Sequence, residues 1–322
     1  MIRILILFFY IISTFAYPTW FENYMENYDK TYTPKEMEDA FHILKPKYEH
    51  IQKHKNTVGL HLRLHHDSDK KKNISRRLHD IKKRSKTTNI SKKKTTLGLP
   101  LNFDWRTHGT VTDIRNQGDC GGCYCFSAID NLEHHYKKKT GKLKKLSVQQ
   151  CLDCTNKKIK DSDGCNGGLM EDVFKLAKHW KVETENKNPF KMKNKICPIT
   201  QPHHGLRVKS YQVMSDDIHS QIENHLAHNL LQYGPIPVGI DSNSLNFELY
   251  KKGIIKEAHC GKEIDHAVTV VGFGVDKNIR YWTIKNSWGE HWGENGYFKL
   301  ERDKNACGIN VYSSFATAVE VV

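Results

Sequence analysis

The segment Gln117–Ser127 constrains the fold most, because it joins a glycine-rich turn to a helix start through a cysteine. Apolar residues recur at helical spacing from Phe126 to Tyr136. We therefore expect Cys123 at or near a helix N-terminus, where the aligned peptide dipoles stabilise a thiolate and lower the thiol pKa. Such a cysteine is a candidate nucleophile. On this segment alone, a structural half-cystine is the alternative.

A nucleophilic cysteine needs a base, and the base needs a group that orients it. His266 stands at the head of a β-rich apolar run, and Asn286 ends another such run before Ser-Trp-Gly. Taken singly, the histidine would be a surface or core residue and the asparagine a turn residue. Together with Cys123 they indicate acyl transfer through a thiol.

Four ordered blocks of the chain resemble the papain family of cysteine proteases, in particular its cathepsin L type. The blocks are Gln117–Ser127, Gly164–Met170, Asp265–Val268 and Asn286–Gly289. The resemblance covers residues 100–322 strongly and 20–60 weakly. It implies an α+β, two-lobed papain-like fold, in which a helical lobe and a β-barrel-like lobe meet at the active-site cleft.

The resemblance also implies roles for individual residues. Cys123 would attack the peptide carbonyl, His266 would pair with it, Asn286 would orient the imidazole, and Gln117 with the Cys123 N–H would form the oxyanion hole. Trp288 would shield the histidine–asparagine bond, with a plain core residue as the alternative. The implied substrate contacts are Gly167, Gly168, Met170, Gly239, Ile264 and either Tyr312 or Ser313 at the pocket floor, suiting an apolar residue two before the cut.

The nine cysteines also follow the family pattern. It implies disulfides Cys120–Cys165, Cys154–Cys197 and Cys260–Cys307. Beyond the nucleophile this leaves Cys125 and Cys151, where relatives usually carry Ala and Leu; a fourth disulfide and two buried thiols both stay open. Zinc on the two Cys-x-x-Cys pairs is a weaker alternative, because their separation is long and secretion disfavours free thiolates. No metal or cofactor is expected.

We expect the chain before residue 99 to be removed by proteolysis during maturation. Residues 1–16 resemble a secretory signal peptide, with an uncleaved anchor as the alternative. Residues 17–98 resemble an inhibitory propeptide ending in a basic linker, or more plainly a helical cap. The linker carries possible glycosylation sites at Asn73 and Asn89. Residues 99–322 would be the peptidase domain, released by a cut between about 94 and 99.

The net charge of +14 is concentrated in the part expected to be removed: residues 1–98 hold 20 basic and 10 acidic side chains, a balance of +10. The remaining +4 gives no reason to expect nucleic-acid binding. The run between Arg63 and Lys94 leaves open that the uncleaved chain binds anionic glycans.

Helix and strand signals separate along the mature region. Helices are expected over 124–136, from Ser147 and over 171–180, and a further helix over 216–232. Strands are expected over 236–240, 267–272, 280–285 and 297–301.

The sequence thus predicts a monomeric cysteine endopeptidase made as a zymogen, in a lysosome- or vacuole-like compartment or outside the cell. Its partners would be protein or peptide substrates and its own propeptide, with no membrane span in the mature form. An inactive papain-like binding protein and a secreted polyanion-binding protein are the alternatives.

Overall fold

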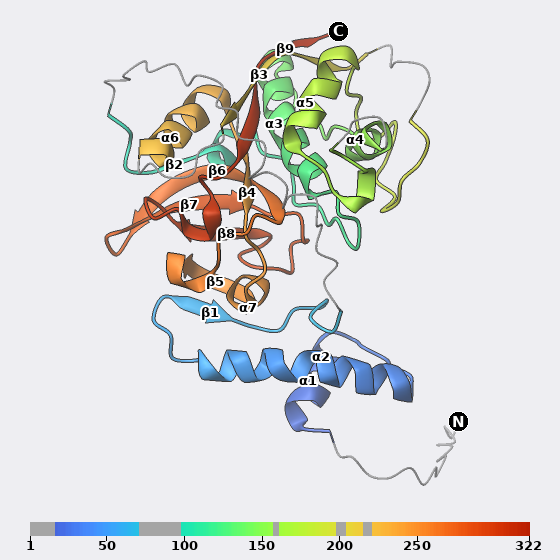
Figure 1. The fold of residues 1–322 in the computed structure, drawn as a ribbon, viewed down its shortest axis with the longest axis vertical. Coiled ribbons are helices and arrows are strands. Elements are labelled where there is room, and N and C mark those ends of the chain that lie inside the picture. Colours follow the sequence, from blue (N-terminus) through green and yellow to red (C-terminus); the bar gives the residue numbers. More distant parts are fainter. Residues whose placement is uncertain (1–16, 71–97, 157–160, 198–203, 215–220) are drawn as a thin grey trace, which may run out of the picture.

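The computed structural model describes residues 17–70, 98–156, 161–197, 204–214 and 221–322. The predicted signal peptide, both glycosylation sites and most of the basic linker lie outside these residues. In Figure 1 an N-terminal arm (residues 17–70) lies at the bottom against a sheet lobe, and a helical lobe lies at the top on the far side of the sheet lobe.

The helices are α1 (Thr19–Asn27), α2 (Pro34–Lys53), α3 (Cys123–Thr140), α4 (Val148–Thr155), α5 (Met170–His179), α6 (Gln221–Tyr233) and α7 (Leu245–Glu248). The strands are β1 (Leu60–Leu62), β2 (Phe103–Asp104), β3 (Leu206–Met214), β4 (Ile236–Ile240), β5 (Tyr250–Ile255), β6 (His266–Asp276), β7 (Ile279–Lys285), β8 (Tyr297–Glu301) and β9 (Ser313–Val321). Short 3₁₀ turns are η2 (Trp105–His108), η3 (Gly164–Asn166), η4 (Glu257–His259) and η5 (Ala306–Gly308).

The helical lobe is built on α3, which begins at Cys123 as the glycine turn predicts. Gly122 precedes it, and a Cβ added there would lie 2.9 Å from Leu152 Cδ2 of α4, so a larger residue would press on the contact between the two helices. The lobe's apolar cluster joins α3, α4 and α5. The Ser147 hydroxyl caps α4 by accepting from the Gln150 N–H at 2.9 Å, but the Gln150 side chain donates to the Lys181 carbonyl rather than back to the cap.

The sheet lobe has the strand order β1-β5-β8-β7-β6-β4-β9-β3, with β2 on β6. β4 and β8 have the predicted bounds, whereas β6 and β7 run longer. The sequence did not predict the antiparallel pair β3 and β9. One reason is an irregular register around Ser210, which disturbs the alternation of buried and exposed side chains.

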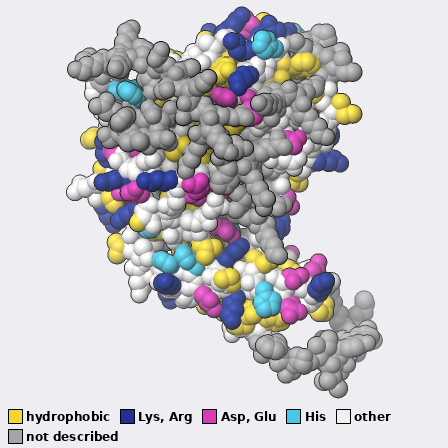
Figure 2. Space-filling model, viewed as in Figure 1, with side chains coloured by type: hydrophobic (Ala, Val, Ile, Leu, Met, Phe, Trp, Pro, Cys, Tyr) yellow, Lys and Arg dark blue, Asp and Glu magenta, His cyan; other side chains and the backbone are white. Residues whose placement is uncertain are grey.

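The N-terminal arm packs through its own aromatic cluster and also joins the sheet. Phe21, Tyr24 and Leu44 are buried between α1 and α2, and Pro34 is the first residue of α2. β1 pairs antiparallel with β5. On the face seen in Figure 2 the described part of the arm carries acidic, basic and histidine side chains interspersed. Within the described residues, no helix has the length and apolar character needed to cross a membrane.

Four disulfides stabilise the two lobes. Three are those the resemblance implies, Cys120–Cys165, Cys154–Cys197 and Cys260–Cys307. The fourth, Cys125–Cys151, links α3 to α4 and resolves the pairing that the sequence left open. Cys123 is free. Because these bridges use three of the four Cys-x-x-Cys sulfurs, the zinc alternative is wrong.

The Cys125–Cys151 bridge should contribute measurably to stability. Replacing both cysteines by the residues usual in relatives, Cys125→Ala with Cys151→Leu, removes the cross-link without leaving a free thiol. We expect the free energy of unfolding to fall by about 3 kcal/mol, as is typical for a loop of this size. Thermal unfolding of the full chain should show a midpoint roughly 5–10 °C lower. An unchanged midpoint would mean that packing between the helices already fixes their contact.

Candidate active site

The free thiol of Cys123 lies in a cavity between the lobes. The cavity measures about 660 Å³, and Cys123 shares its lining with Gln117, His266 and Trp288. The thiol is covered, since Cys123 is only 2% exposed. Residues 65–68 and Lys70 of the N-terminal arm line the same cavity, so the arm contributes to this cover.

His266 and Asn286 meet because β6 and β7 are antiparallel neighbours, which brings the start of one beside the end of the other. The His266 Nε2 atom lies 2.8 Å from Asn286 Oδ1. The Ser287 backbone N–H also donates to that oxygen at 2.8 Å, which fixes the amide with its oxygen towards the ring. An amide oxygen only accepts, so Nε2 carries the proton, and Nδ1 is left for proton exchange with a thiol.

Trp288 covers the imidazole, as the resemblance implies. The two rings stack with centroids 5.0 Å apart and planes 28° from parallel. Phe247 and Trp292 pack edge-on against Trp288 and hold it there. Apolar surroundings of this kind strengthen a hydrogen bond by keeping water away from it.

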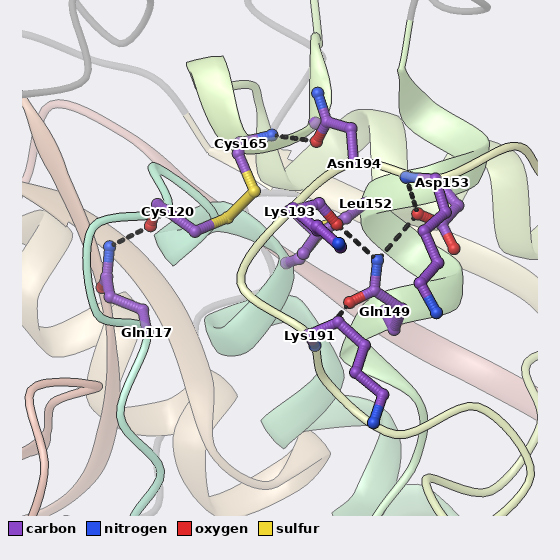
Figure 3. Close-up of a disulfide and its surroundings, with 12 residues drawn as sticks. Gln117, Cys120, Gln149, Leu152, Asp153, Cys165, Lys191, Lys193 and Asn194 are labelled. Carbon is purple, nitrogen blue, oxygen red and sulfur yellow. Dashed lines mark hydrogen bonds between the residues drawn. A yellow bond between two sulfur atoms is a disulfide. The ribbon is translucent and has the colours of Figure 1, made fainter.

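Both polar atoms of the Gln117 side-chain amide are hydrogen-bonded. The Ser287 hydroxyl donates to Gln117 Oε1 at 2.6 Å, and Gln117 Nε2 donates to the Cys120 carbonyl at 2.9 Å. Figure 3 shows this amide beside the Cys120–Cys165 disulfide. One N–H of the amide remains for another acceptor. The sequence did not predict that Ser287 fixes the Gln117 amide, because Ser287 was considered only as part of the Asn286–Gly289 block.

A buried charged network ties the two lobes together next to the site. Lys285, adjacent to Asn286, donates from Nζ to Asp130 of α3 at 2.7 Å and to Thr112 at 3.1 Å. Arg115 is paired with Glu133 of the same helix. Because Asp130 and Cys123 lie on one helix, this network fixes the strand that carries Asn286 relative to the nucleophile. Nothing in the sequence marks these partners, which are far apart along the chain.

The pKa of the Cys123 thiol is raised, whereas the sequence predicted that the helix N-terminus would lower it. Burial raises the pKa of Cys123 to about 12, and the Asp265 carboxylate adds to the increase. A hydrogen bond from the Ala267 backbone, next to His266, acts in the opposite direction. In this covered form, burial therefore outweighs the helix end, and the thiol is protonated at neutral pH.

The expected substrate-contact residues lie in the helical lobe and along the facing strands. Gly167 has a φ of 102°, and a Cβ on Gly168 would lie 2.5 Å from Ser162 Oγ, so each position requires glycine. Met170, Ile264 and Tyr312 pack in one buried cluster.

Tyr312 lies directly beside Gly239. The Gly239 N–H donates to the Tyr312 carbonyl at 2.8 Å, and the Tyr312 hydroxyl accepts from the Glu171 N–H at 3.3 Å. Ser313 instead pairs with Val238 in the sheet. Tyr312, rather than Ser313, therefore contacts the residues expected to line the pocket.

The N-terminal arm is fixed over the cavity by polar contacts. Lys47 binds both the Glu248 carboxylate and the Ser68 carbonyl at 2.6 Å. Arg63 donates to the His291 carbonyl at 2.6 Å, and His65 Nδ1 donates to the same oxygen at 3.3 Å. The contacts with Glu248 and His291 hold the arm against the sheet lobe, whereas the bond from Lys47 to Ser68 lies within the arm.

His65 makes this cover dependent on pH. Burial lowers the pKa of His65 from its ordinary 6.5 to about 4, and the Arg63 guanidinium acts in the same direction. The covered form thus binds fewer protons than the open form. The free energy that favours the covered form is greatest above pH 6.5 and decreases as the pH falls towards 4. The decrease is at most about 3 kcal/mol.

Alkylation of Cys123 by iodoacetamide would measure this opening in the full chain, because the covered thiol is unreactive. In His65→Gln, which keeps a donor but does not titrate, the pH at which alkylation becomes fast should fall by about one unit. His42→Gln, on the exposed face of α2, is the matched control. If both variants followed the parent profile, groups other than His65 would control the opening.

Comparisons with known proteins agree with this geometry. Residues 99–317 match the model of the papain family of cysteine proteases. The chain is 34% identical over 303 residues to a pro-cathepsin H of Medicago truncatula, covering 92% of this chain and 85% of that protein. It is 37% identical to a cathepsin L of Sarcophaga peregrina, covering 68% of this chain and 64% of that protein. The structure of a digestive procathepsin L 3 of Tenebrio molitor larval midgut superposes with a TM-score of 0.76 at 27% identity, over 93% of this chain and 98% of that one.

Proposed function

The chain belongs to the papain family of cysteine proteases, and from this premise we propose that it is an endopeptidase zymogen whose nucleophile is Cys123. One observation carries the proposal above all: the free thiol shares a cavity with a histidine that is already oriented by an asparagine. The same constellation performs thiol-dependent acyl transfer in general.

The proposed reaction starts once the arm has left the cleft. Cys123 then gives its proton to His266, and the thiolate–imidazolium pair lowers the thiol pKa. The thiolate attacks the peptide carbonyl, and the oxyanion is held by the Gln117 amide and the Cys123 N–H. The His266 imidazolium protonates the leaving amine, which yields a thioester. Water, deprotonated by His266, then releases the acid product.

We assign residues 17–98 to an inhibitory propeptide and 99–322 to the mature enzyme, with residues 1–16 as the secretory signal. The contacts of Lys47, Arg63 and His65 with the mature part support an inhibitory role. Four disulfides suit an oxidising compartment, either lysosome- or vacuole-like or extracellular. N-terminal sequencing of the active form would test the boundary, which we expect between about 94 and 99; a start upstream of Arg63 would refute it.

The substrate preference is proposed to be apolar at the residue two before the cut. Met170, Gly239 and Ile264 offer an apolar lining, and Tyr312 beside Gly239 would make the pocket short. Medium-sized aliphatic side chains should therefore fit better than large or charged ones. Between Cys154 and Cys165 the sequence has no long insertion of the kind that restricts relatives to chain ends, which favours an endopeptidase.

Hydrolysis of fluorogenic peptides after acid processing tests the function. The parent chain should be active, whereas Cys123→Ala, processed in trans, should show no turnover. Three departures from the usual family sequence, at Tyr124, Gly122 and Cys125, favour an inactive binding protein instead. That alternative would be supported if folded, processed parent protein failed to cleave a positional-scanning library.

A further inference from the structure

The loop that follows α5 presents Met192 at the cavity. Met192 is 59% exposed although it is apolar, and its φ of 54° lies in the left-handed region that residues with side chains rarely adopt. It lines the same cavity as Cys123, Gln117 and Gly118. A Cβ added to Gly118 would lie 2.6 Å from Met192 Sδ, so the methionine occupies the space that a side chain at 118 would fill.

This loop is held on both sides of Met192 by buried polar side chains of α4. The Gln149 side chain accepts from the Lys191 N–H and donates to the Lys193 carbonyl, both at 2.8 Å. Asp153 Oδ1 accepts from the Lys195 N–H at 2.7 Å. Figure 3 shows the contacts of Gln149 with Lys191 and Lys193. The strained residue is therefore fixed by its neighbours, as is typical of functional positions.

The loop is also joined to the segment expected to bind substrate. Asn194 Oδ1 accepts from the Cys165 N–H at 2.7 Å, and Cys165 lies two residues before Gly167. Met192 thus lies on the side of the cleft proposed to hold residues before the cut. Its contact with Gly118, next to Gln117, places it near the scissile carbonyl.

We propose that Met192 is a specificity-determining residue that contacts the substrate side chain immediately before the scissile bond, an inference that rests on the proposed function. A flexible thioether packs best along long, unbranched side chains such as methionine, norleucine, glutamine or the stems of lysine and arginine. β-branched side chains pack less closely against the Met192 side chain.

The test compares Met192→Glu with Ile196→Glu in the processed enzyme. Both replace an exposed apolar residue of this loop, but Ile196, 93% exposed, is not among the residues that line the cavity. Substrates carry a fixed residue two before the cut and either arginine or norleucine immediately before it. Met192→Glu should raise the arginine-to-norleucine ratio of kcat/KM by about fivefold, from attraction between unlike charges in a partly hydrated site. Ile196→Glu should leave the ratio unchanged.

Met192→Gly, which suits the positive φ, removes the wall without a folding cost and should reduce the preference for norleucine over valine at that position. The inference is overturned if the parent enzyme is active and Met192→Glu leaves the ratio unchanged. An equal response in Ile196→Glu, or a change confined to residues after the cut, would overturn it too. An inactive, folded parent would refute the proposed function itself.

Discussion

Replacing His266 by alanine should lower kcat/KM for peptide hydrolysis by about 10⁴-fold or more, as is usual when one member of a nucleophile–base pair is lost. The variant loses both the partner of the thiolate and the proton donor for the leaving amine. Its thiol, without an imidazolium, should also react slowly with iodoacetamide at pH 5–6. Turnover of a fluorogenic peptide by protein processed in trans would measure the first effect.

His291→Ala provides the matched control for that experiment. His291 lines the same cavity, but it is its backbone carbonyl, not its ring, that binds Arg63 and His65 of the arm. Its replacement should leave turnover by the processed enzyme nearly unchanged. Similar losses in the two variants would show that cavity shape, rather than proton transfer by His266, sets the rate.

Replacing Gln117 by alanine should reduce kcat by about 10²–10³-fold, or about 2.7–4 kcal/mol, with little change in KM. The amide would bind the oxyanion only in the transition state, so its loss should not weaken ground-state binding. Gln117→Glu should be at least as damaging, because a carboxylate repels the oxyanion. Steady-state kinetics on the processed enzyme would separate kcat from KM.

Ser287→Ala refines the same experiment. This variant keeps the amide but removes the hydroxyl that donates to its oxygen. The loss in kcat should be about fivefold, the usual value of one neutral hydrogen bond. A rise in KM without a fall in kcat for Gln117→Ala would contradict an oxyanion role and point to substrate binding.

The sequence was most informative where chemistry and local structure coincide. Glycines before Cys123 predict the helix start at the thiol, and the resemblance extends the site to His266 and Asn286. The separation of helices from strands in the mature region also followed from local periodicity. The fold class was confirmed, and the implied disulfides are present.

The remaining features depend on contacts that no local pattern encodes. The Cys125–Cys151 bridge required knowing that α3 and α4 cross at those positions. The raised pKa of Cys123 follows from cover by distant residues, whereas the helix end is local. Lys285 meets Asp130 only because strand and helix are brought together by the whole fold.

The pairing of β1 with β5 has a consequence for the processed enzyme. In the full chain β5 is an inner strand, paired with β1 on one side and β8 on the other. Loss of the arm would turn it into an edge strand and expose a row of unpaired backbone groups, which are prone to intermolecular association. Lys251 and Lys252 are both exposed on this strand. Their like charges would repel those of a second activated molecule and oppose edge-to-edge pairing of the two β5 strands. Loss of the arm would therefore free the cleft without making the enzyme prone to aggregate.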